Sequence, residues 1–161
     1  MLKPYICVVC EKVILEQPPE GIPAGATGVP SLISLFNKII AVTTGNAQGV
    51  PQEIPPNTVV PKEWCVFSSW DAEPGDEYRR YVVRTQILYP DNAPFGLTAT
   101  SPLAIERDRR SQNIVRILGF PIGQIGKYTI RTWVEENGQM VLEPIDIKVE
   151  VEVHRQPQLT P

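Results

Sequence analysis

Histidine and cysteine are scarce in this chain of 161 residues, which contains one His and three Cys. Serine- or cysteine-based hydrolysis needs a histidine as general base, and His154 would have to fill that role alone. It falls on the polar face of the last predicted strand, where we expect an exposed side chain. A second cysteine pair is also lacking, so no zinc ligand set is present. We therefore predict that the protein is not an enzyme and that it has no catalytic site, no metal and no cofactor.

An excess of charge and a long apolar run are lacking as well. The formal net charge is −3, whereas nucleic-acid-binding domains normally carry a strong basic excess. The most apolar stretch, residues 29–42, contains polar side chains and is shorter than the ~20 residues that a membrane span needs. The N-terminus shows no signal-peptide pattern, and an odd number of cysteines agrees with reduced thiols. We expect a cytoplasmic protein that binds neither nucleic acid nor membrane.

Proline, in contrast, is abundant. The 17 prolines are about twice the usual ~5% share, while a hydrophobic content of 42% is too high for a disordered chain. This composition fits one domain over residues 1–155, followed by a flexible C-terminal tail at 156–161. Proline- and glycine-rich segments at 18–30 and 45–61 are predicted loops.

Alternation of apolar and polar residues predicts about seven to nine strands. The predicted strands include 5–17, 63–70, 80–89, 103–106, 113–120, 128–135 and 145–154. In the first strand the alternation slips near Glu11 and Lys12, where we expect a β-bulge that brings Val8 and Val13 to one face.

Asn137 and Gly138 give the strongest local signal, a two-residue hairpin turn that requires positive φ angles. Tyr128 follows a glycine turn at the start of a late strand, which is the position of the tyrosine corner in immunoglobulin-like sandwiches. Ile130 stands where antibody domains have a cysteine, so their disulfide is absent. The sequence predicts an all-β fold, an antiparallel immunoglobulin-like β-sandwich with at most one short helix.

Residues 31–42 admit two interpretations. Leu32, Leu35, Phe36 and Ile39 recur at helical spacing, whereas residues 39–44 have strong β character. We expect a short helix or turn that runs into a strand, with an all-strand segment as the alternative.

Several short motifs carry a resemblance. They are the segment Ser31–Ile39, an aromatic strand near Trp64, Tyr89–Asn92, Gly119–Pro121 and Gly126–Tyr128 before the hairpin. Together they resemble a family of small bacterial proteins of unknown function with a predicted β-sandwich. The resemblance implies this fold and a bacterial or phage cytoplasmic setting, and it implies no activity.

Cys7 and Cys10 have the spacing of a redox or zinc pair. They lie in a predicted strand, however, where residues three apart point to opposite faces. We expect two buried, unreactive thiols. Four carboxylates crowd one turn, those of Asp71, Glu73, Asp76 and Glu77. Their spacing does not match a calcium loop, so we expect solvated side chains.

Two segments are candidate partner-binding surfaces. Residues 106–110 form the main basic concentration, and their acidic neighbours weaken the local field, which favours a protein partner over nucleic acid. The last strand, residues 145–154, is predicted at a sheet edge, where open backbone groups accept another strand. The candidate contact residues are Arg107, Arg109, Arg110, Val149 and Val151. We predict a protein partner or a homo-oligomer.

The resulting hypothesis is a non-catalytic protein-interaction or structural subunit. One alternative is a small-ligand or carbohydrate-binding module that uses exposed tryptophans, and another is an enzyme with an unrecognised site. Trp64, Trp70 and Trp133 discriminate between the first two. A solvent-facing pair favours ligand binding, whereas buried tryptophans favour a protein partner.

Overall fold

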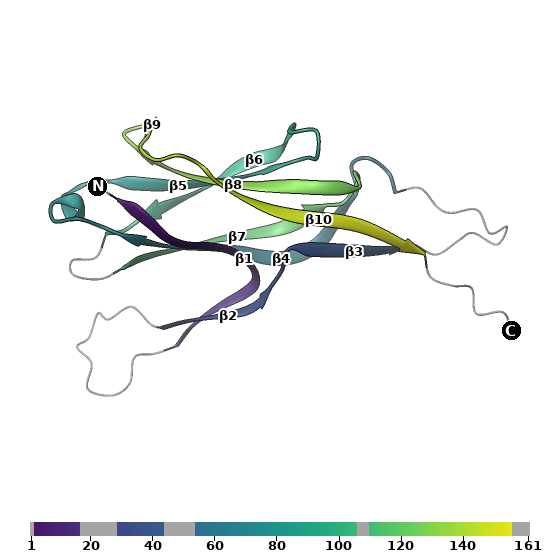
Figure 1. The fold of residues 1–161 in the computed structure, drawn as a ribbon, viewed down its shortest axis with the longest axis horizontal. Coiled ribbons are helices and arrows are strands. Elements are labelled where there is room, and N and C mark those ends of the chain that lie inside the picture. Colours follow the sequence, from purple (N-terminus) through teal and green to yellow (C-terminus); the bar gives the residue numbers. More distant parts are fainter. Residues whose placement is uncertain (1, 17–28, 44–53, 106–109, 156–161) are drawn as a thin grey trace, which may run out of the picture.

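The computed structural model describes residues 2–16, 29–43, 54–105 and 110–155, nearly all of them in strands or tight turns (Figure 1). The predicted tail at 156–161 and most of the two predicted loops lie outside these residues. One 3₁₀-helix, Asp76–Tyr78, occurs in the described part. No helix there is long and apolar enough to cross a membrane. The all-β prediction is confirmed.

The strands form two sheets that are almost entirely antiparallel. The four-stranded sheet has the order β2 (Val29–Leu35), β1 (Lys3–Glu16), β4 (Val59–Asp71) and β7 (Ser111–Pro121). The six-stranded sheet has the order β3 (Lys38–Thr43), β10 (Ile145–Arg155), β8 (Gly126–Glu136), β5 (Tyr81–Leu88) and β6 (Pro94–Leu103), with β9 (Gln139–Met140) paired to β8. One pair, β3 with β10, is parallel.

The main hydrophobic core lies between the two sheets, because its buried members come from both. Strand β4 shows how the sequence builds it. Trp64, Val66 and Trp70 point into the core, while Cys65 and Phe67 point to the outer face, where they form a second, smaller cluster. The predicted alternation is therefore confirmed, and both faces of this strand are buried. Tyr81, Val83, Thr85 and Ile87 supply the facing side of β5.

Strand β1 changes partner along its length. It pairs with β4 as far as Cys10 and with β2 from Cys10 onward, and it bends away from the core between these parts (Figure 1). The expected bulge near Glu11 is wrong, since the pairing with β2 keeps one register from Cys10 to Glu16 and the register shift of β1 lies between Pro4 and Ile6. The irregular residue near Glu11 is on β2, where Ser34 has a φ angle of 53°. Val8 and Val13 nevertheless reach the same outer cluster, because the bend brings Val13 over that face.

The helix expected within residues 31–42 is wrong, because this segment forms β2 and β3. The chain crosses from one sheet to the other between these strands. Leu32 packs against the outer cluster, whereas Phe36 and Ile39 pack against the central core. The apolar residues at helical spacing thus serve two different cores.

Two local predictions are confirmed, and one is corrected. Asn137 and Gly138 have φ angles of 52° and 80° and join β8 to β9. The buried Tyr128 hydroxyl donates to the Gln124 carbonyl at 2.9 Å and accepts from the Gln124 N–H at 3.1 Å. The strand expected at 103–106 lies earlier, at β6, which ends at Leu103.

Candidate functional site

The tryptophans do not form a ligand platform. Trp64 and Trp70 are 0% and 1% exposed. Their indole N–H groups donate to the Gly119 carbonyl at 3.0 Å and to the Ser68 hydroxyl at 2.9 Å. Trp133 is half-buried on the outer face of β8, and its N–H donates to Glu135 of the same strand. The Trp64–Trp70 pair therefore belongs to the core and is not available to stack on a sugar.

Cys7 and Cys10 point to opposite faces of β1, which confirms the prediction. Cys7 packs against the central core, where burial raises the pKa of its thiol to about 11. Cys10 belongs to the outer cluster, and burial raises the pKa of its thiol to about 11 as well. The two thiols therefore cannot act together as a redox or zinc pair.

The prediction of an exposed side chain is confirmed for His154 and corrected for one residue of the acidic turn. His154 is exposed, as expected, and its Nε2 lies 3.1 Å from a carboxylate oxygen of Glu152. Asp76 is buried, which corrects the expectation of a solvated side chain. It accepts hydrogen bonds from the Tyr81 hydroxyl and the Glu73 N–H, both at 3.0 Å. Among the described residues, no three His, Cys, Asp or Glu side chains gather as metal ligands would.

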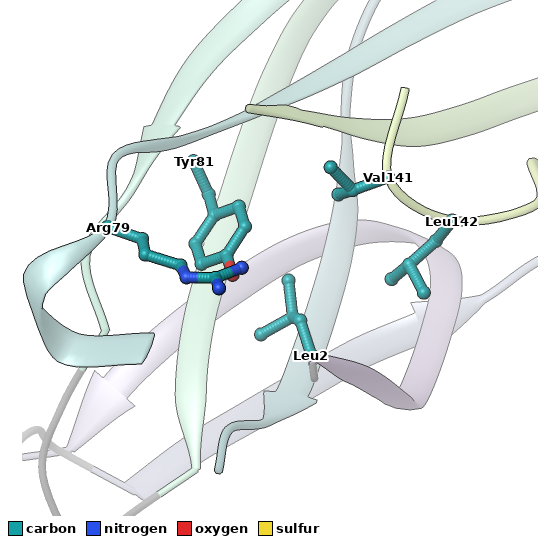
Figure 2. A pocket seen from close by; sticks show the side chains of 5 residues that line it. All are labelled: Leu2, Arg79, Tyr81, Val141 and Leu142. Carbon is teal, nitrogen blue, oxygen red and sulfur yellow. The ribbon is translucent and has the colours of Figure 1, made fainter. Parts of the chain in front are cut away.

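A pocket of about 250 Å³ lies next to this turn (Figure 2). Its walls are Leu2, Arg79, Tyr81, Val141 and Leu142. Among the described residues that line it, Arg79 carries the one charge, and it is 3.4 Å from a Glu136 oxygen and 3.8 Å from an Asp76 oxygen. Because two carboxylates offset the guanidinium charge, the pocket offers little attraction to an anionic ligand. We interpret it as a gap in packing at this end of the sheets.

We expect the free energy of unfolding to decrease in acid partly because of Asp76. Burial raises the pKa of this carboxyl, but the hydrogen bonds from the Glu73 N–H and the Tyr81 hydroxyl lower it. The hydrogen bonds outweigh burial, so the net shift of the pKa is downward. A carboxyl with a lowered folded-state pKa contributes stability above its unfolded pKa of about 3.9 and loses it as the pH falls. Urea unfolding between about pH 6 and pH 2 tests this.

In that experiment, Asp76→Asn should show a shallower dependence on pH than the wild type. Tyr81→Phe, which removes one donor to Asp76, should lie between the two. If Asp76→Asn followed the wild-type slope, the carboxyl would have no such role.

The predicted basic surface is only partly described. Arg107 and Arg109 lie outside the described residues. The Nε of Arg110 is 2.9 Å from an Asp71 oxygen, and its guanidinium lies 3.3 Å from the centre of the Tyr5 ring. This arginine is therefore held by an ion pair and a cation–π contact, and its part in partner binding stays a prediction.

The prediction that the last strand is a sheet edge is wrong for its second half, residues 150–155, whereas in the described structure its first half pairs with β8 alone. Strand β10 lies between β8 and β3, and β3 pairs with it from Glu150 to Arg155. Val149 and Val151 are completely buried, so their side chains are not available to a partner. In the first half of β10, Ile147 faces β1 across a hollow of about 300 Å³. Sequence reasoning missed this because the covering strand comes from residues more than 100 positions earlier in the chain.

The edge strand next to β10 is β3. Ile39 and Ala41 pack inward, while Ile40 and Val42 point outward and are 50% and 61% exposed. The Asn37 carbonyl accepts a hydrogen bond from Glu150 of β10. Since backbone groups alternate along a strand, those of Ile39 and Ala41 also point to β10. The N–H and C=O groups of Ile40 and Val42 therefore point to the open edge.

Among the described strands, the other three that end a sheet, β2, β7 and β6, carry features that hinder strand addition. Prolines, which lack a backbone donor, occur in β2 (Pro30) and in β6 (Pro94 and Pro102). In β7, the side-chain amide of Asn113 donates to Ser101 and Pro102 of β6 and so ties that edge to the opposite sheet. Strand β3 has no proline, and its one charged residue is Lys38 at its start. Only the strong β character of residues 39–44 pointed to it in the sequence.

No family model matches the chain, and no curated protein matches it. The resemblance to a bacterial family stays a prediction. The geometry of β3 is therefore the feature that bears on function.

Proposed function

We propose that this protein is a non-catalytic interaction subunit that associates with a second copy of itself by pairing their β3 edges. The exposed, apolar, proline-free edge of β3 is the observation that carries the proposal. We also propose that the two sheets form an immunoglobulin-like sandwich. The hydrogen bond of Tyr128 at the start of β8 supports this, since it has the geometry of a tyrosine corner. The motif resemblance supports a bacterial cytoplasmic setting.

The β3 edge is complementary to itself. In an antiparallel pair related by a two-fold axis, Ile40 of one copy lies opposite Val42 of the other, and the reverse holds by symmetry. These are the residues whose backbone groups point outward, so each such pair exchanges two N–H···O bonds. Their side chains meet on one face and cover each other from water. The net charge of −3 opposes this association only weakly.

Ligand binding is less well supported. The Trp64–Trp70 pair that a sugar would need is in the core. The Figure 2 pocket is small, and its arginine is already paired with two carboxylates. Neither feature presents an unused polar group that would orient a small molecule.

Val42→Lys is the most direct test of the proposal. A lysine on an edge strand opposes strand addition through its charge, and two copies would place two lysines beside apolar side chains. We expect the dissociation constant of the dimer to rise by about 100-fold, as measured by sedimentation over a range of concentrations.

Leu97→Lys is the matched control. Leu97 is 96% exposed on β6, the opposite edge of the same sheet. This variant should dimerise like the wild type, and circular dichroism should show that both variants keep the fold. A wild type that stays monomeric at millimolar concentration would refute the proposal. The same holds if Leu97→Lys raised the dissociation constant as much as Val42→Lys does.

A further inference from the structure

Cys10 and Cys65 face each other across β1 and β4. Their Cα atoms are direct partners in this antiparallel pair, so both side chains point to the same face. Both are buried in the outer cluster, together with Val13 and Phe67. The Sγ atom of Cys10 lies 3.9 Å from the Cys65 carbonyl oxygen. The Cys10–Cys65 pair is distinct from the Cys7–Cys10 motif of the sequence, although Cys10 belongs to both.

The backbone pairing brings the Cα atoms of the two residues to a separation that disulfides also have. The Val9 carbonyl accepts from the Phe36 N–H at 3.2 Å, on the side away from β4. The backbone groups of the next residue, Cys10, must then point to β4. This makes Cys10 and Cys65 a hydrogen-bonded pair, for which the Cα atoms are about 5.5 Å apart. Disulfides most often have Cα atoms about 5.5–6 Å apart.

We propose that Cys10 and Cys65 are a redox modification site that forms a reversible cross-strand disulfide. The oxidant is a low-molecular-weight disulfide. One cysteine attacks it as thiolate and forms a mixed disulfide, which releases one small thiol. The other cysteine then attacks the mixed disulfide and releases the second small thiol. The two protein thiols lose two electrons and two protons, and the small disulfide gains them.

The position of the pair gives this bond a structural effect. Cys10 is the last residue of β1 that pairs with β4, and beyond it β1 pairs with β2 alone. A disulfide there would fix the base of the β1–β2 hairpin to β4. Burial raises the pKa of Cys10 to about 11 and also raises that of Cys65. The exchange therefore requires a transient opening of the hairpin, and it is slow in the native state.

Cys7 has a different environment and is the internal control. It points from the other face of β1 into the central core. A disulfide between Cys7 and Cys10 would have to bridge opposite faces of one strand. The structure thus predicts one specific pairing among three cysteines, with the partners 55 residues apart.

The test is intact mass spectrometry of the full chain after incubation with excess oxidised glutathione. The wild type should lose about 2 Da without retaining glutathione, and peptide mapping should join Cys10 to Cys65. Cys7→Ser should react in the same way, and dithiothreitol should reverse the reaction. The oxidised protein should have a Tm higher by roughly 5–15 °C, because the bond closes a long loop.

Cys65→Ser and Cys65→Ala should both fail to lose this mass. Both variants lack the Cys65 thiol, so if one of them folds poorly the other still provides the comparison. The proposal would be overturned by a Cys7–Cys10 bond, by loss of the reaction in Cys7→Ser, or by a wild type that stays reduced or retains glutathione only.

Discussion

Trp64→Ala is expected to remove a large part of the free energy of unfolding. The indole is completely buried, lies edge-on to Phe36 and Phe120 at ring distances of 6.3 and 5.6 Å, and donates to the Gly119 carbonyl. Truncation of a buried tryptophan costs about 3–5 kcal/mol, and the carbonyl left without its donor adds about 1–3 kcal/mol. A domain of this kind has about 5–15 kcal/mol of stability in total.

Urea unfolding followed by circular dichroism measures the effect. Trp133→Ala is the matched control, because Trp133 is half-buried on the outer face of β8 and its N–H donates to the half-buried Glu135 of the same strand. It should cost less than about 2 kcal/mol. An unfolding midpoint of Trp64→Ala close to that of the wild type would mean that this residue is not part of the core.

Val149→Pro is expected to lower the free energy of unfolding strongly as well. Val149 is completely buried and lies opposite Tyr128 of β8. Since Glu150 donates to the β3 side, the backbone groups of Val149 point to β8. Proline removes that donor from the interior of the sheet and restricts φ, at a cost of about 3 kcal/mol or more.

Val149→Ala separates the backbone effect from the loss of side-chain volume. It keeps the N–H and should cost roughly 2 kcal/mol, so the protein should still fold. Urea unfolding of the two variants gives the comparison. If Val149→Pro folded as well as Val149→Ala, β10 would lie at a sheet edge, contrary to the structure.

The features that the sequence predicts correctly depend on neighbouring residues. Trp64 to Trp70 alternate between two faces in strict order, and this order follows from the strand period alone. Asn137 and Gly138 adopt the positive φ angles that their residue types favour. Tyr128 finds its acceptor four residues earlier in the chain.

The features that the sequence does not predict depend on which distant segments of the chain lie side by side. The last strand has every local property of an edge strand, yet β3 covers its second half from residues 38–43. In the sequence Cys10 has the spacing of a pair with Cys7, whereas in the fold it lies opposite Cys65 of another strand. Asp76 is buried because Tyr81 and Glu73 supply donors. Composition and spacing do not encode these pairings.

The central claim, that β3 is the edge that pairs, is tested most directly by amide hydrogen exchange at low and high protein concentration. The amides of Ile40 and Val42 point outward, so they should exchange quickly in the monomer and become protected as the concentration rises. The amides of Ile39 and Ala41, which point to β10, should be protected at both concentrations. Unchanged exchange at Ile40 and Val42, or new protection along β6 instead, would contradict the claim.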